Sequence, residues 1–491
     1  MPILDLLVFF TYLLLVVGFG ISFSFRKRTA SDFTTGGGRL PSWAIGMSIF
    51  ATFVSSISFL ALPGNAYSGN WNGFVFSLSI PLAAWVAVRY FVPLYRNLGS
   101  ESAYYFLEQR FGPWARIYAS ICYLLTQLAR MGAIMYLLAL PMQALLGWSI
   151  PVIILVTGLS VLIYSMLGGI EAVIWTDAIQ GIILIGGALA CLGVIFWEIP
   201  GGVSEVFQVA EANEKFSLGS FDLDFTTSTF WMVLVYGIFI NLQNFGIDQS
   251  YVQRYLTAKT EKDAKRSTWL GSLLYLPVSF LFFFIGTSLF AFYQSQPLLL
   301  PDGTAGDKVF PFFIVNQLPA GITGLLIASI FAAGMSTVST SINSSATVIL
   351  SDHFKKYIQP NPSEKTSLLV LKLSSLGMGL LSILVGFAFN GVASALDAWW
   401  ALSSIFSGGI LGLFFLGLLG KTKKPQAILS VTLGVLVIAW MSLSSGWVKI
   451  GFPESLVNPF HSNMTIVIGT MTIFLAGFGL TQLSRKKNLH S

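Results

Sequence analysis

Residues 321–345, "GITGLLIASIFAAGMSTVSTSINSS", begin as an apolar helix and end in a run of oxygen-bearing side chains. The first fifteen residues are typical of a membrane-spanning helix, whereas eight of the last ten carry a hydroxyl or a carboxamide. Polar groups are costly inside a bilayer unless they face other protein groups or a ligand. The stretch therefore predicts a helix inside a bundle, with one face that serves a purpose beyond packing.

The rest of the chain has the composition of a helical membrane protein. Hydrophobic residues make up 55% and charged residues 10%, with a mean hydropathy of +0.76. The apolar segments have helical periodicity and are long enough to cross a bilayer. We expect an all-α polytopic membrane protein with about thirteen transmembrane helices, near 5–25, 42–64, 73–95, 115–146, 150–168, 173–196, 229–247, 268–293, 321–351, 367–390, 395–419, 426–446 and 462–483.

The basic residues predict the orientation of these helices. Positive charge follows the first segment, at 26–28, and none precedes it, which favours a retained helix with its N-terminus outside. Thirteen crossings then put the C-terminus inside, and 23 of the 27 lysines and arginines fall in or beside inside loops. Arg254 is one of them, in the loop after residue 247. The net charge of +6 indicates loops that face anionic lipid, with no nucleic-acid partner.

The longest outside connections divide the chain into two blocks of five helices. An odd number of helices gives two tandem blocks opposite orientations, as in transporters built from inverted repeats. The expected organisation is an extra N-terminal helix and loop (1–41), a first repeat (42–196), an outside loop (197–228), a second repeat (229–419), and two C-terminal helices with a basic tail (420–491).

The second segment, "SWAIGMSIFATFVSSISFLALPGNAY" (42–67), has the pattern of a broken helix. Ser55, Ser56 and Ser58 lie in mid-span, and Pro63-Gly64 follows. Backbone carbonyls freed by an unwound turn need a partner, and a bound cation supplies one. The alternative is an unbroken helix whose serines bond to the preceding turn or pack against another helix.

Two charged residues lie inside predicted helices. Arg130 is near the centre of the fourth segment and is expected to face the bundle. It is either a clamp for a substrate carboxylate or a structural residue that forms an ion pair or caps backbone carbonyls. Asp177 lies near the start of a helix that begins on the inside. It is expected either to stabilise that helix terminus or to bind a cation.

The polar face of 321–345 favours a monovalent cation. Ala333, Ser336, Thr337 and Thr340 follow a helical spacing and share one face. Neutral hydroxyls and carbonyls suit sodium, whereas calcium favours several carboxylates and zinc favours histidine or cysteine. The three histidines all lie in loops or the tail, and no nucleophile–base pair lies at mid-depth. We expect a transporter rather than an enzyme.

Four motifs resemble the sodium:solute symporter family, and most of all its bacterial sialic acid:sodium symporters. They are "SIFATFVSSISFLALPGNAY" (48–67), "MLGGIEAVIWTDAIQG" (166–181), "DQSYVQRYL" (248–256) and "IFAAGMSTVSTSINSS" (330–345). The resemblance implies a LeuT-type core of ten helices, with one helix before it and two after. It also implies a monomeric multi-pass protein of a bacterial inner membrane, with sodium as coupling ion and no cofactor.

The resemblance also implies two sodium sites. The first combines backbone carbonyls of the broken helix with an alanine and two hydroxyls of the polar helix: Ala51, Val54, Ala333, Ser336 and Thr337. The second, described for the sialic acid branch, matches Asp177, Ser336, Ser339 and Thr340. Two sodium ions per transport cycle are therefore expected.

The substrate positions match the sialic acid branch in part. Ser55, Ser56, Ser58 and Arg130 fit its pattern, with serine at 58 where threonine is usual. Phe53 and Ser77 stand where that branch has threonine and glutamine, although Ser77 still offers a hydroxyl. We expect import of an acidic sugar such as sialic acid. A neutral sugar or another small carboxylate is the alternative, and a proton-coupled transporter or a sodium-dependent sensor or channel is more remote.

Overall fold

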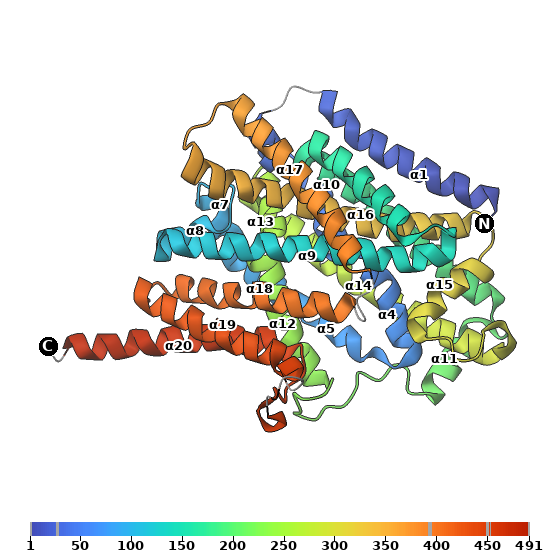
Figure 1. The fold of residues 1–491 in the computed structure, drawn as a ribbon. Helices are drawn as coiled ribbons and strands as arrows, with labels where there is room; N and C mark the ends of the chain where they lie inside the picture. Colours follow the sequence, from blue (N-terminus) through green and yellow to red (C-terminus); the bar gives the residue numbers. More distant parts are fainter. Residues whose placement is uncertain (1, 26–28, 391–394, 448–450, 452, 490–491) are drawn as a thin grey trace.

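The computed structural model describes residues 2–25, 29–390, 395–447, 451 and 453–489. Regular structure in these ranges is helical, apart from one isolated bridge between Leu40 and Ala258. Figure 1 shows long helices packed side by side, with the N-terminal end of α1 and the C-terminal end of α20 at opposite ends of the bundle. The basic residues at 26–28, on which the predicted orientation of the first helix depends, lie outside the described residues.

The first half of the chain begins with α1 (Ile3–Ser22), which is followed by the short α2 (Ala30–Thr35). The later helices of this half are α3 (Ser42–Phe53), α4 (Ser56–Ser68), the joined turns α5 (Val75–Leu78), α6 (Ile80–Val86) and α7 (Val92–Asn97), α8 (Tyr105–Phe111), α9 (Pro113–Leu146), α10 (Ile150–Glu198) and α11 (Gly202–Ala212).

The second half continues from α12 to α20. Its helices are α12 (Phe230–Ile247), α13 (Gln249–Thr257), α14 (Glu261–Ser295), α15 (Gly306–Asn316), α16 (Ile322–Val348) with the π-helical turn η6 (Ile349–Ile358), α17 (Glu364–Ala388), α18 (Ala395–Leu419), α19 (Lys424–Trp447) and α20 (Met464–Leu489). Within the described ranges, ten stretches are long and apolar enough to cross a membrane, and eleven if the bent pair α3–α4 counts as one span.

A glycine divides α10, which at 49 residues is much longer than one bilayer crossing. Gly169 has a φ of +57°, and a Cβ there would lie 2.9 Å from the Cα of Phe33. Only glycine combines this backbone conformation with so close an approach. The break falls between the predicted segments 150–168 and 173–196, which is why sequence periodicity separated them.

The expected break in the second segment is present. α3 and α4 are bent by 55°, and Val54 and Ser55 between them are extended. The Ser55 side chain accepts a hydrogen bond from the Ser58 backbone N–H and so caps α4. Pro63 lies within α4, so the break occurs at the serines and not at the Pro-Gly pair.

A second break was not expected. α12 ends at Ile247, Asp248 is extended and caps α13, and α13 continues as a buried helix. The prediction of an inside loop after 247 that contains Arg254 is therefore wrong, because Arg254 is fully buried. The nine residues of α13 are mostly polar, which hydropathy interprets as exposure, but their side chains bond to neighbouring helices.

α16 is the most enclosed helix of the bundle. All residues from 336 to 345 are buried, and α16 packs on α10, α9, α1 and α17. Its N-terminus is held by Asp5 of α1, whose Oδ1 accepts hydrogen bonds from the backbone N–H groups of Gly321 (2.6 Å) and Gly324 (2.9 Å). α1, which precedes the expected ten-helix core, thus caps α16, which lies inside that core.

Replacing Asp5 tests this cap. Asp5→Ala leaves two N–H groups without an acceptor and should destabilise the protein by about 1–2 kcal/mol. We expect a lower thermal unfolding temperature in detergent for Asp5→Ala and a smaller decrease for Asp5→Asn, which keeps an acceptor oxygen. Asp302→Ala, in an exposed loop, serves as the control. An Asp5→Ala protein as stable as the wild type would contradict the role of the cap.

Candidate functional site

The site lies where the break between α3 and α4 meets α16. The extended backbone of Val54 and Ser55 leaves carbonyls in the last turn of α3 without helical partners. The carbonyl of Ala51 accepts a hydrogen bond of 2.9 Å from the Ser336 hydroxyl of α16. One side chain of the polar helix therefore contacts the freed backbone directly.

Four of the five residues expected at the first sodium site form one cluster of oxygens. The Ser336 hydroxyl, which has one proton to share between two acceptors, also lies 3.1 Å from the Ala333 carbonyl, and Thr337 donates to that carbonyl (3.1 Å). A hydroxyl that donates to a carbonyl keeps its lone pairs for a cation. Val54, the fifth residue, is buried within the break itself.

Two of the four residues expected at the second sodium site, Asp177 and Thr340, meet through an arginine. Arg254 donates from Nη2 to Asp177 Oδ2 (2.8 Å) and to Thr340 Oγ1 (2.6 Å). Ser48 of α3 also donates to Asp177 Oδ2 (2.6 Å). Ser339 is buried on α16 and donates to the Ser336 carbonyl (3.0 Å). The expected ligands are thus on adjacent helices, with a guanidinium on two of them.

Arg254 is the functional candidate that sequence reasoning missed. The count of basic residues assigned it to a loop, although it lies in the quoted motif "DQSYVQRYL". Its side chain and that of Asp177 are both 0% exposed. Asp177 and Arg130 were considered as charges within predicted helices, and each needs a partner there. The sequence does contain a signal for it: Arg254 is the basic residue of the motif 248–256, and a buried Asp177 needs a basic partner.

Three of the expected substrate residues gather at the break. Ser56 is buried, and its hydroxyl has no hydrogen-bond partner among the described residues. Ser55 and Ser58 share a long contact of 3.4 Å between their hydroxyls. These side chains begin α4, so their oxygens lie next to the freed carbonyls of α3.

Arg130 of α9 points at the same break. Its Nη2 donates a long hydrogen bond of 3.5 Å to the Thr52 carbonyl. Its charge acts on the carboxylate of Asp248, which also accepts a hydrogen bond of 3.4 Å from Gln127. Both helix breaks therefore contribute groups to one polar region, with the guanidinium beside it.

Ser77 and Phe53 surround this region differently. Ser77 is buried on α5, and its hydroxyl lies 2.7 Å from that of Ser279 on α14, so it is engaged in helix packing. Phe53 stacks on Phe245, with ring centroids 5.5 Å apart, and meets Tyr275 edge-on at 4.5 Å. The side of the break formed by Phe53 is aromatic.

The remaining polar residues of 336–345 bind neighbouring helices. Ser341 donates to Gln127 (2.6 Å), Asn343 accepts from Gln253 (2.8 Å), and Ser344 accepts from Tyr123 (2.7 Å). They join α16 to α9 and α13. The polar stretch thus contains one set of oxygens near the break and another that holds the bundle together.

A charge network joins α8, α9 and η6 beyond this region. Arg116 pairs with Asp352 (2.6 Å) and Glu108 (2.7 Å), and Lys356 also contacts Glu108. Burial raises the pKa of the Glu108 carboxyl, but hydrogen bonds from Lys356 and Arg116 lower it more, so the pKa stays below its ordinary value. The network links these elements by ionised side chains.

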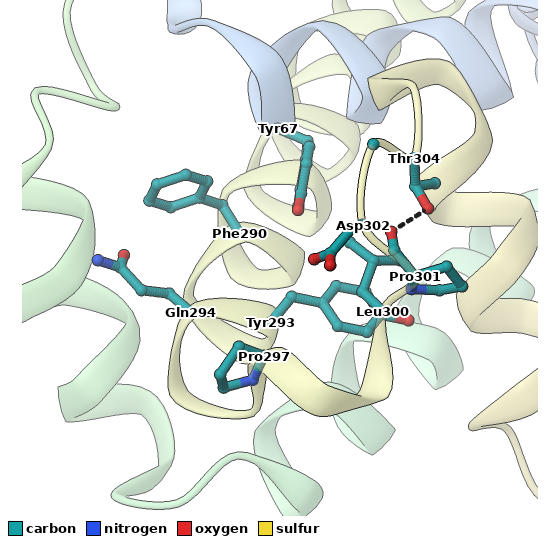
Figure 2. A pocket seen from close by; sticks show the side chains of 10 residues that line it. Tyr67, Phe290, Tyr293, Gln294, Pro297, Leu300, Pro301, Asp302 and Thr304 are labelled. Atoms are coloured by element: carbon teal, nitrogen blue, oxygen red, sulfur yellow. Dashed lines mark hydrogen bonds between the residues drawn. The ribbon is translucent and has the colours of Figure 1, made fainter.

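Figure 2 shows a cavity of about 350 Å³ between the end of α4, the end of α14 and the loop before α15. Tyr67, Phe290 and Tyr293 line it, and the Asp302 carboxylate points into the space between Tyr67 and Tyr293. Tyr67 is eleven residues beyond Ser56, which is roughly 17 Å along a helix. The cavity is lined by none of the expected sodium or substrate residues, so it is separate from the candidate site at the helix breaks.

Comparisons with known proteins show the family to which the chain belongs. Residues 33–434 match the sequence profile of the sodium:solute symporter family. The sodium/sialic acid symporter SiaT of Proteus mirabilis is 36% identical, over 96% of this chain and 93% of its own length. NanT of Aliivibrio fischeri, also a sodium/sialic acid symporter, is 32% identical over 99% and 94%.

Solved structures show the same relationship. A sodium-coupled sialic acid symporter, solved in a substrate-bound outward-open state, aligns with a TM-score of 0.89 at 33% identity, over 98% of both chains. Mhp1, a nucleobase–cation symporter, aligns with a TM-score of 0.58 at 13% identity, over 92% of this chain and 95% of its own, and shares the fold. The family match covers most of the chain. This protein belongs to the sodium:solute symporter family.

Proposed function

We propose that this protein is a sodium-coupled symporter that imports an acidic sugar of the sialic acid type by alternating access, with two sodium ions per cycle. The observation that carries the proposal is the contact of Ser336 with the Ala51 carbonyl, because it joins α16 to the broken helix with oxygen groups that suit sodium. The relatives named above, which are sodium/sialic acid symporters, support the choice of substrate.

The proposed architecture has thirteen crossings in a bacterial inner membrane, with the N-terminus outside and the C-terminus inside. The two breaks support inverted repeats at 42–196 and 229–419, since each is in the first helix of its block. The N-terminal end of α1 and the C-terminal end of α20 lie at opposite ends of the bundle, which supports an odd number of crossings (Figure 1). The protein is proposed to act as a monomer in the lipid bilayer.

The proposed cycle begins with sodium. An ion held by carbonyls of the α3 end and hydroxyls of α16 ties these elements together and stabilises the outward-open state. Substrate then binds at Ser55, Ser56, Ser58 and Arg130, with the guanidinium on its carboxylate. Rocking of the repeats exposes ions and substrate to the inside. Each charge moved gains about 2.3 kcal/mol per 100 mV of membrane potential.

One observation favours the alternative of a different small carboxylate. Phe53 packs into an aromatic cluster where the sialic acid branch has a threonine, and Ser77 is bonded to Ser279. Both differences remove polar contacts from the substrate side of the break, while Arg130 keeps the preference for an acid. A substrate with fewer hydroxyls than sialic acid would fit these changes.

Uptake by proteoliposomes tests the transport class. We expect the purified protein to accumulate N-acetylneuraminate when sodium is high outside, because the ion gradient drives the cycle. Equal accumulation with potassium outside would contradict sodium coupling. Accumulation driven by a pH gradient without sodium would instead assign coupling to protons. Liposomes without protein provide the passive leak.

Thr337→Ala tests the first sodium site. The variant removes one hydroxyl ligand, so the half-saturating sodium concentration should rise about tenfold, equivalent to about 1.4 kcal/mol. Ser382→Ala is a matched control, since Ser382 is a buried hydroxyl of α17 that likewise bonds to a carbonyl of its own helix. Thr337→Ser keeps the hydroxyl and should retain wild-type sodium dependence. Sodium activation unchanged in Thr337→Ala would remove Thr337 from the site.

Arg130→Lys tests the carboxylate clamp. Lysine keeps the charge but lacks the planar fork that binds a carboxylate with two hydrogen bonds. We expect at least a tenfold loss of affinity for N-acetylneuraminate, measured by ligand-induced thermal stabilisation in sodium, with sodium binding retained. A screen that includes neutral sugars and small carboxylates identifies the substrate class. Unchanged affinity for every acidic ligand would assign Arg130 a structural role.

A further inference from the structure

Arg254 connects four helices through one buried guanidinium. From α13 it donates to Ser48 of α3 (2.8 Å), Asp177 of α10 (2.8 Å) and Thr340 of α16 (2.6 Å). Its Nη1 donates to the Ser250 carbonyl of its own helix (2.7 Å). A buried charge is tolerated only when it is paired and hydrogen-bonded, and this guanidinium is both.

The carboxylate of Asp177 uses only one of its oxygens in this arrangement. Oδ2 accepts from Ser48 and Arg254, whereas Oδ1 is buried and has no hydrogen-bond partner among the described residues. A buried carboxylate oxygen without a partner is costly. The two oxygens of the carboxylate therefore differ: Oδ2 is hydrogen-bonded to the arginine and Ser48, and Oδ1 is available to a ligand.

Arg254 also acts on a second expected sodium ligand. The Thr340 hydroxyl accepts from Arg254 and lies 3.3 Å from the Thr52 hydroxyl. The polar face of α16 on which Thr340 lies also carries Ser336. An ion at Asp177 Oδ1 and the α16 hydroxyls would be beside a fixed positive charge, in a region where charges are poorly screened.

We propose that Arg254 is a positioning residue that sets the sodium affinity of the second site. It holds Asp177 through Oδ2, leaves Oδ1 for sodium, and weakens the binding of that ion by neutralising the carboxylate. This inference rests on the proposed sodium symport and specifies how one of its two ions is held.

The physical reason is charge balance. Asp177 and Arg254 form a neutral pair, so an incoming sodium ion meets no net negative charge at this site. Repulsion by a nearby cation disfavours a second positive charge, as it does for a neighbouring protonated group. A conducting or transporting site must bind its ion weakly enough to release it. The positive charge of Arg254 keeps the sodium affinity of the second site low enough for release.

The test compares charge variants of the full-length protein in detergent. Binding of radiolabelled sodium is titrated at constant ionic strength with choline chloride, and sodium-dependent thermal stabilisation is followed in parallel. Arg254→Gln should lower the half-saturating sodium concentration of the second site at least tenfold, because Asp177 loses its internal counter-ion. Arg254→Lys keeps the charge and should stay within threefold of wild type.

The double variant Asp177→Asn/Arg254→Gln is the matched control. It replaces the ion pair by two neutral amides, and it should bind one sodium ion with the affinity of the first site. If Arg254→Gln does not fold, Arg254→Lys and the double variant decide the matter. Binding of two ions by Arg254→Lys and of one ion by the double variant supports the proposal.

Other results overturn it. A purely structural arginine predicts that Arg254→Gln binds the second ion more weakly or with unchanged affinity, and either outcome contradicts the proposal. Loss of the second ion in Arg254→Lys would show that the fork geometry, not the charge, matters. If the wild type binds two ions but the variants do not show the expected sodium affinities, only the role of Arg254 is contradicted. A wild type without sodium-specific binding contradicts the proposed function itself.

Discussion

The structure depends on one constraint, which is that polar groups buried among apolar helices need partners inside the protein. At residues 54–55 and at 248 the backbone leaves its helix, and carbonyls lose their helical hydrogen bonds. α16 runs through the bundle beside the first break, and its Ser336 hydroxyl reaches the Ala51 carbonyl. One polar side chain of the apolar stretch thus bonds to backbone that the first break sets free, and others, such as Ser341 and Asn343, bond to side chains of neighbouring helices.

The same constraint governs the charged residues. Asp177 and Arg254 are fully buried, so the charge of each compensates the cost of burying the other. Ser48 and Thr340 provide further hydrogen bonds to the pair. This pairing ties α3, α10, α13 and α16, which in the proposed cycle belong to both repeats. In the proposed cycle these repeats move relative to one another, so the polar contacts between them are ones that a bound ion would strengthen or loosen. Apolar packing alone lacks this sensitivity to ions.

Sequence patterns predicted much of the fold because hydrophobic segments are long and the polar face of α16 has a helical period. The break at 54–55 was also predictable, since three serines in mid-span are unusual in an apolar helix. The break at Asp248 and the burial of Arg254 were not predicted. Hydropathy and counts of basic residues describe each residue by itself, whereas the burial of α13 depends on partners far away in sequence, such as Asp177. The hydrogen bond between Ser77 and Ser279 was not predicted either, because these residues are also far apart in sequence.

A weak second ion has an energetic consequence for the proposed cycle. An anionic substrate carries one negative charge, so two sodium ions make the inward step electrogenic by one positive charge, worth about 2.3 kcal/mol per 100 mV. Each tenfold sodium gradient adds about 1.4 kcal/mol for each ion moved. These gains are realised only if both ions leave on the inside, and an ion bound tightly by an unneutralised Asp177 would leave slowly. In the proposed cycle, a guanidinium that neutralises the carboxylate weakens the binding of the second ion, which favours its release on the inside and so retains its contribution to the drive.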